Sequence, residues 1–250
     1  MLTQESDHIP ISALTHDISH LATTSNQKVC LSAHKLSKVV GNAPNQITIL
    51  HNLNLQVLQG ESVAIVGSSG SGKSTLLGLL AGLDSPTDGV VTVHEQAFSE
   101  LDEDARAAIR GANMGFVFQS FQLLPTMTAL ENVMIPLQLA RNSQAKLLAQ
   151  NALTQVGLSQ RMQHYPKQLS GGEQQRVAIA RAFATKPTIL FADEPTGNLD
   201  IATGQQIIDI LFKLNTDTGT TLILVTHDMA LAKRCKRVLQ LQHGQLVTSA

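Results

Sequence analysis

The stretch Ser62-Val63-Ala64-Ile65-Val66-Gly67-Ser68-Ser69-Gly70-Ser71-Gly72-Lys73-Ser74 decides the fold. Its first five residues form a short apolar run, which predicts a buried strand. Gly67–Ser74 then fits the pattern Gly-x-x-x-x-Gly-Lys-Ser/Thr, and an apolar helix is expected over Thr75–Ala81. Glycines let the backbone approach phosphates closely, and amide groups at a helix start point toward an anion. The stretch therefore predicts a phosphate-binding loop between a buried strand and a helix.

Each part of this loop has an expected task. Lys73 is expected to reach the β- and γ-phosphates of a nucleotide, and the Ser74 hydroxyl is expected to ligate Mg²⁺. A simple glycine-rich turn is the alternative interpretation, but the strand before the loop and the helix after it favour phosphate binding. The predicted nucleotide-binding residues are Gly67, Ser68, Ser69, Gly70, Ser71, Gly72, Lys73, Ser74 and Thr75.

Strand-like and helix-like segments alternate along the rest of the chain. Short strands are expected between Val29 and Val66, and the middle of the chain, about Leu101–Gln168, is mostly helical in pattern. Further predicted elements are strands over Met114–Phe118, Thr188–Ala192 and Thr221–Val225 and a helix over Ile201–Leu214. The alternation predicts an α/β fold with a mainly parallel sheet.

The composition argues against several classes of protein. In 250 residues, 18 Lys+Arg and 19 Asp+Glu give a formal net charge of −1, so no nucleic-acid partner is expected. No apolar run approaches the roughly 18 residues that span a bilayer, and no signal peptide is recognisable. Cys30 and Cys235 are far apart and outside any Cys-x-x-Cys motif, so neither a disulfide nor a zinc site is expected, and a reducing cytoplasm fits.

Residues 1–28 are polar, and we interpret them as a poorly ordered tail ahead of a folded domain at residues 29–250. His16 and His20 are spaced to share a helix face, but no carboxylate or cysteine completes a metal site. A solvated tail is therefore the preferred interpretation.

Two acidic residues, Asp193 and Glu194, end the apolar run Ile189–Ala192. Unpaired buried carboxylates are costly, so this position indicates a chemical role. Because neighbouring side chains on a strand point in opposite directions, the two carboxylates can do different tasks. We expect Asp193 to hold Mg²⁺ and Glu194 to orient or deprotonate an attacking water. The alternative is a pair of solvated carboxylates at a turn before Pro195.

Ser170, Gly171, Gly172 and Glu173 begin a second helix, which continues to Phe183. Serine at the cap and glutamate three residues later form a capping box. Each glycine costs a helix roughly 1 kcal/mol relative to alanine, but it leaves a bare amide group that a ligand can approach. We interpret this helix start as a second phosphate site, without its own lysine, that would close over a nucleotide held elsewhere, for example by another chain.

The residues Leu169–Arg176, Leu-Ser-Gly-Gly-Glu-Gln-Gln-Arg, resemble the signature motif of ABC-type ATPases. Further motifs of that family follow in matching order: Gln119 resembles the Q-loop glutamine, Gly197–Asp200 the D-loop and His227 the switch histidine. The resemblance covers about residues 29–248. It implies a P-loop NTPase core of the RecA-like type, N-terminal antiparallel strands and a helical subdomain inserted at approximately residues 120–172.

The resemblance also implies a reaction and an assembly. ATP and Mg²⁺ would be bound, and ATP and water would be converted to ADP and phosphate, in head-to-tail homodimers with two sites. Ser170, Gly171, Gly172 and Glu173 would face the ATP of the partner subunit, with Asp200 in the D-loop. The implied catalytic residues are Lys73, Gln119, Glu194 and His227, and the implied metal ligands are Ser74, Gln119 and Asp193.

One position departs from the family pattern. Many members have an aromatic residue that stacks on adenine, and by spacing Val40 lies near that place. We therefore expect adenine to be held by apolar contact alone.

The segments Phe116–Pro125, Thr128–Val133 and Ala192–Asp200 resemble a bacterial subgroup, the LolD/MacB type, and within it YbbA-like members most. This resemblance implies an integral membrane permease with a large periplasmic domain as a separate partner chain. The chain would then act at the cytoplasmic face of the bacterial inner membrane, in export, lipoprotein release, efflux or mechanotransmission.

Two alternatives belong to other classes. A soluble ABC ATPase acting on DNA or ribosomes would need a long coiled-coil insertion or a second ATPase unit, and neither is present in the sequence. A regulatory binder that has lost hydrolysis is disfavoured because Lys73, Asp193, Glu194 and His227 are all in place.

Overall fold

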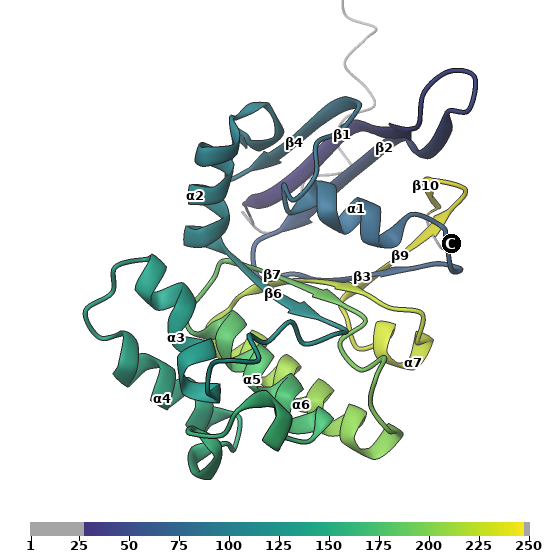
Figure 1. Cartoon of the computed structure of the whole chain (residues 1–250). Coiled ribbons are helices and arrows are strands. Elements are labelled where there is room, and N and C mark those ends of the chain that lie inside the picture. Colours follow the sequence, from purple (N-terminus) through teal and green to yellow (C-terminus); the bar gives the residue numbers. More distant parts are fainter. Residues whose placement is uncertain (1–27, 248–250) are drawn as a thin grey trace, which may run out of the picture.

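One helix, α1, lies between two β-sheets, and this arrangement sets the position of the phosphate loop (Figure 1). The computed structural model describes residues 28–247. The larger sheet has the strand order β10-β9-β3-β8-β7-β6 and is parallel except for the edge strand β10. Its strands are β3 (Ser62–Val66), β6 (Met114–Phe118), β7 (Ile189–Asp193), β8 (Thr221–Val225), β9 (Arg237–Gln242) and β10 (Gln245–Val247).

The parallel strands are continuous apolar runs because both faces of this sheet are covered. In β3, Val63 and Ile65 pack toward α1 and the smaller sheet, whereas Ala64 and Val66 pack toward the helices on the other side. Two separate cores therefore hold the strand in place, immediately before the phosphate loop.

The helices divide between these two cores. Figure 1 shows α5 and α6 on the side of the larger sheet opposite α1, with α3 and α4 beside α5 at the lower left. The helices are α1 (Lys73–Leu80), α2 (Glu103–Asn113), α3 (Ala129–Leu139), α4 (Ala145–Gln155), α5 (Gly171–Phe183), α6 (Ile201–Thr218) and α7 (Met229–Ala232), with 3-10 turns at Phe98–Glu100, Ser159–Arg161 and Pro166–Gln168.

The smaller sheet is antiparallel, with the order β2-β1-β4-β5, and one sequence-based expectation about it is wrong. Short strands were expected here, but β1 and β2 each run for 12 residues. Their pairing is interrupted by register shifts, for example between Ala33 and Leu36, which break the two-residue alternation and hide one long strand. The strands are β1 (Val29–Val40), β2 (Ile47–Leu58), β4 (Asp88–Val93) and β5 (Gln96–Ala97).

The strands predicted over Met114–Phe118, Thr188–Ala192 and Thr221–Val225 match β6, β7 and β8 within one residue. The fold class is confirmed: an α/β fold with a mainly parallel sheet and N-terminal antiparallel strands. Both cysteines are buried and unbridged, and burial raises the pKa of the Cys235 thiol to about 12. His16 and His20 lie outside the described residues. Among residues 28–247, every helix is too short or too polar to cross a bilayer.

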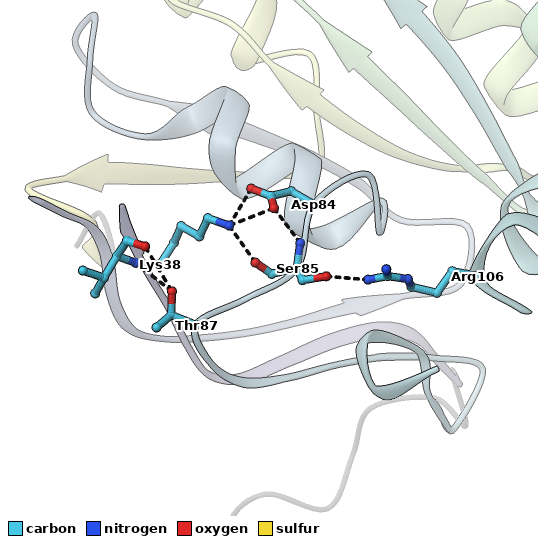
Figure 2. A network of polar contacts seen from close by, with 6 residues as sticks. Lys38, Asp84, Ser85, Thr87 and Arg106 are labelled. Carbon is cyan, nitrogen blue, oxygen red and sulfur yellow. Dashed lines mark hydrogen bonds and ion pairs between the residues drawn. The ribbon is translucent and has the colours of Figure 1, made fainter. Parts of the chain in front are cut away.

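A polar network fastens the smaller sheet to the loop after α1 (Figure 2). The Lys38 ammonium on β1 lies 2.7 Å from Asp84 Oδ2 and donates to the Ser85 carbonyl at 2.8 Å. Arg106 on α2 donates to the Ser85 hydroxyl at 2.7 Å, and the Thr87 hydroxyl bonds to the backbone of β1. Burial acts to raise the pKa of Asp84, but hydrogen bonds and charge from Lys38 outweigh it, so this pKa lies below its usual range.

Replacing Lys38 by methionine should reduce the free energy of unfolding by about 0.5–1 kcal/mol at neutral pH, since Asp84 is half exposed. Because the folded-state pKa of Asp84 is lowered, the loss should be complete above about pH 5 and should shrink as pH falls through that pKa. Urea unfolding as a function of pH measures it, with the exposed Lys167→Met as control. A loss that does not change with pH would contradict the assignment.

Candidate nucleotide-binding site

The phosphate loop joins β3 to α1 and is shaped by its glycines. Gly70 and Gly72 have φ angles of +77° and +98°, in the left-handed region that favours glycine. A Cβ on Gly67 would lie 2.4 Å from the Leu241 carbonyl oxygen of the neighbouring β9. A side chain would therefore strain the backbone at Gly70 and Gly72, and at Gly67 it would clash with β9.

The Lys73 ammonium reaches back over the loop. It donates hydrogen bonds to the carbonyl oxygens of Gly67, at 2.9 Å, and Ser68, at 3.0 Å. A cavity of about 380 Å³ adjoins it, and its lining residues are Ile49, Ser69, Gly70, Gly72, Lys73, Ser74, Thr75, Asp193 and Glu194. The positive charge and the residues that start α1 thus face the same cavity as the two acidic residues.

Asp193 is the last residue of β7, in register with Phe118 of β6 and Val225 of β8. Burial is the main cause that raises its pKa; the Glu194 charge adds to it, while the Ser74 hydroxyl and Lys73 oppose it. Its Oδ1 atom is buried and has no hydrogen-bond partner among residues 28–247. An unpartnered carboxylate oxygen beside a serine hydroxyl is a donor set that suits Mg²⁺.

Glu194 lies just beyond β7, and its backbone has a φ of +46°. Glu194 was expected to point away from Asp193 because both would lie on one strand, but Glu194 lies outside β7. Its left-handed backbone sets the direction of its side chain, and the Glu194 amide donates to the Val225 carbonyl at 2.9 Å. The Glu194 Oε1 atom lies 2.8 Å from His227 Nδ1. The Glu194 side chain is 18% exposed and that of His227 is 73% exposed, so the histidine is the solvent-facing member of the pair.

Gln119 follows β6 at the same edge of the sheet, but its side chain contacts Asn198, in the segment after Glu194. Its amide nitrogen lies 3.3 Å from Asn198 Oδ1, and the Asn198 amide donates to the Gln119 carbonyl at 3.0 Å. Gln119 does not line the cavity beside Lys73. Its role as a metal ligand stays a prediction.

The second helix start has the capping box that the sequence predicts. Ser170 accepts a hydrogen bond from the Glu173 amide, and the Glu173 carboxylate accepts one from the Ser170 amide. A Cβ on Gly172 would lie 2.4 Å from Thr203 Cγ2, so close packing against α6 also favours glycine at this position. Asp200 caps α6, and hydrogen bonds from Thr203 hold its pKa below the usual range.

Comparisons with known proteins give the same family as these motifs. A family profile described as ABC transporter matches residues 50–197. The chain is 54% identical to the ABC transporter ATP-binding protein YbbA of Escherichia coli K12, over 88% of this chain and 97% of that one. It is 49% identical to the lipoprotein-releasing system ATP-binding protein LolD of Pseudomonas fluorescens, over 89% and 99%. The chain belongs to the ABC transporter family.

A solved structure gives the same result for the fold of this ABC family chain. The dimeric post-hydrolysis structure of the ATP-binding cassette MJ0796, bound to ADP and Pi, superposes with a TM-score of 0.80 at 41% identity, over 86% of this chain and 96% of that one. The resemblance drawn from the signature motif and the fold it implies, that of an ABC ATP-binding domain, are thereby confirmed.

Val40 lies at the end of β1, opposite Ile47 of β2. A second cavity, of about 760 Å³, adjoins the phosphate loop at Ser68–Ser71 and is lined on its apolar side by Ile47 and Ile49, not by Val40. Ile47 is 64% exposed, which is unusual for an isoleucine on a strand. The sequence alone did not indicate that these two isoleucines line a cavity, because their position beside the phosphate loop depends on the pairing of distant strands.

The raised pKa of Asp193 leads to a prediction about stability. Since burial disfavours its ionised form, Asp193→Asn should raise the melting temperature of the protein without nucleotide at neutral pH. The gain should be complete above the folded-state pKa and should vanish as pH falls below the ordinary aspartate value of about 3.9. Asp209→Asn is the matched control: hydrogen bonds from Arg234 and Gln205 lower the pKa of Asp209, so its replacement should not stabilise. Thermal unfolding across pH measures both, and a lower melting temperature for Asp193→Asn would refute the argument.

Proposed function

We propose that this chain hydrolyses ATP with Mg²⁺, as the peripheral subunit of a complex with a separate membrane permease. One observation carries the proposal: Lys73, Ser74, Asp193 and the Glu194–His227 pair converge at the carboxyl edge of the parallel strands. This edge is where open α/β sheets bind ligands. The names of the relatives, a transporter ATP-binding protein and a lipoprotein-releasing system ATP-binding protein, support a role in transport.

The residues at this edge suit a magnesium nucleotide. Ser74 and the Asp193 carboxylate, whose Oδ1 atom has no partner among residues 28–247, would hold Mg²⁺, with Gln119 as a further proposed ligand. When bound, Mg²⁺ neutralises charge on the phosphates. The loop amides and Lys73 would bind the phosphate oxygens and orient the terminal phosphate toward Glu194.

Glu194 would position and deprotonate the attacking water. Its carboxylate is largely buried, fixed by a left-handed backbone and hydrogen-bonded to His227, so its direction is set before the reaction. His227 would hold Glu194 through its Nδ1–H, and in the imidazolium form it would also donate from Nε2–H to the terminal phosphate. Catalysis of this kind depends mainly on positioning and electrostatics.

We also propose a head-to-tail homodimer in the ATP-bound state. The helix start at Ser170, Gly171, Gly172 and Glu173 would meet the nucleotide of the partner subunit, and Asp200 would lie at the same interface. The dimeric state of the MJ0796 cassette supports this assembly. The permease, with its periplasmic domain, would place the chain at the cytoplasmic face of the bacterial inner membrane.

Glu194→Gln should separate ATP binding from hydrolysis. Glutamine keeps the shape of the side chain but does not accept the proton of the water, so phosphate release should fall at least about 100-fold while ATP still binds. Light scattering should then detect an ATP-bound dimer. Glu95→Gln, at an exposed turn, is the control. An unchanged rate would exclude Glu194 as the base, and a monomer in saturating Mg-ATP would exclude the dimer.

The same variant tests the membrane partner. Tagged Glu194→Gln protein, purified with Mg-ATP from gently solubilised membranes of its native host, should carry a four-span permease with a large periplasmic domain, identified by mass spectrometry. Recovery of the soluble chain alone, or with ribosomes or DNA, would leave the ATPase proposal standing and overturn the transport one.

A further inference from the structure

Gln175 is a polar residue that the proposed chemistry does not use. It lies on α5, in the second turn after the Ser170 cap, and it is 0% exposed. Its amide nitrogen donates to the Pro195 carbonyl at 2.5 Å, whereas its amide oxygen is buried without a hydrogen-bond partner among residues 28–247. Leucine or methionine would fill such a site without a buried unpaired amide oxygen, but neither could donate to the Pro195 carbonyl. The bond to Pro195 is therefore the feature that distinguishes glutamine at this position.

Pro195 follows Glu194 directly, in a turn held at each end by the backbone. The Glu194 amide donates to the Val225 carbonyl of β8, and the Gly197 amide donates to the Glu194 carbonyl at 3.0 Å. Gln175 holds the middle of the turn by its carbonyl and links it to a different element, the helix α5. The direction of the Glu194 side chain thus depends on three fixed points, one of which is a side chain.

We propose that Gln175 is a positioning residue for ATP hydrolysis: its hydrogen bond to the Pro195 carbonyl fixes the turn that carries Glu194 relative to helix α5. This proposal rests on the proposed ATPase function. Since Ser170 caps α5, this helix joins the end that would face the nucleotide of the partner subunit to the carboxylate that would act on the chain's own nucleotide. A shift of α5 at one ATP site would therefore change hydrolysis at the other.

The packing around this contact supports a rigid link. Leu199 in the segment after Glu194 and Thr203 in the first turn of α6 lie against the α5 glycines: a Cβ on Gly171 would be 3.3 Å from Leu199 Cδ2, and one on Gly172 would be 2.4 Å from Thr203 Cγ2. The close approach of Gly172 and Thr203 therefore couples the start of α5 to the first turn of α6, into which the segment after Glu194 leads.

The chain offers a matched control at the preceding residue. Gln174 donates from its amide to the Leu169 carbonyl at 3.1 Å, a contact within the same helix start that does not reach Pro195. Methionine is as long as glutamine and flexible but has no donor, so Gln175→Met and Gln174→Met remove one side-chain hydrogen bond each.

The experiment compares the full-length wild-type chain, Gln175→Met and Gln174→Met, together with the permease if the complex requires it. ATP affinity, kcat, KM and melting temperature are measured for each. For Gln175→Met we expect kcat to fall about 10- to 100-fold, because a small misplacement of a reacting group has such an effect, with the Kd for ATP within about threefold of wild type. Gln174→Met should keep the wild-type kcat.

Each other outcome has a defined meaning. An unchanged kcat in Gln175→Met overturns the proposal. Equal losses of ATP-binding capacity and turnover, with a lower melting temperature, also overturn it, because they indicate a purely structural role. A wild-type chain that binds ATP but never hydrolyses it, even with its permease, refutes the ATPase function itself, and the control variants then show the same lack of activity.

Discussion

The site at the sheet edge centres on a carboxylate, that of Asp193, whose ionised form is disfavoured by burial. Asp193 ends a strand whose other residues are fully apolar, and burial raises its pKa while one of its oxygens has no partner among the described residues. A position selected for stability alone would not carry this residue. The opposing influences, the Ser74 hydroxyl and the Lys73 charge, both come from the phosphate loop, so the loop and β7 form one electrostatic unit.

The parallel sheet makes that unit possible. Strands β3, β6, β7 and β8 end at the same edge of the sheet because they run in the same direction. The residues that follow these strands therefore lie close to one another. Two cores fix the sheet from both faces, so the edge is rigid although the segments that follow it are loops. The result is a preorganised site, in which Lys73 is already held over the loop by two carbonyl oxygens.

Sequence reasoning located this edge because its signals are local. The apolar runs, the glycine pattern of the phosphate loop and the capping box at Ser170 each depend on residues within one short segment. The missed features depend on distant partners: Gln119 and Asn198 are 79 residues apart, and the long strand β1 is hidden by its own register shifts. The backbone of Glu194 was also beyond prediction, since a strand pattern gives no sign of a left-handed residue at its end.

The two signature glycines show how packing and ligand binding can share one residue. Bare amides at a helix start suit a phosphate, yet Gly172 also has no room for a side chain, because Thr203 lies where its Cβ would be. Activity lost on replacing Gly172 would therefore report movement of α6 as much as loss of a nucleotide contact. Gly171 faces the flexible end of Leu199 at 3.3 Å, which can give way. Of the two positions, Gly171 is the one at which an added methyl group reports mainly on the approach of a ligand.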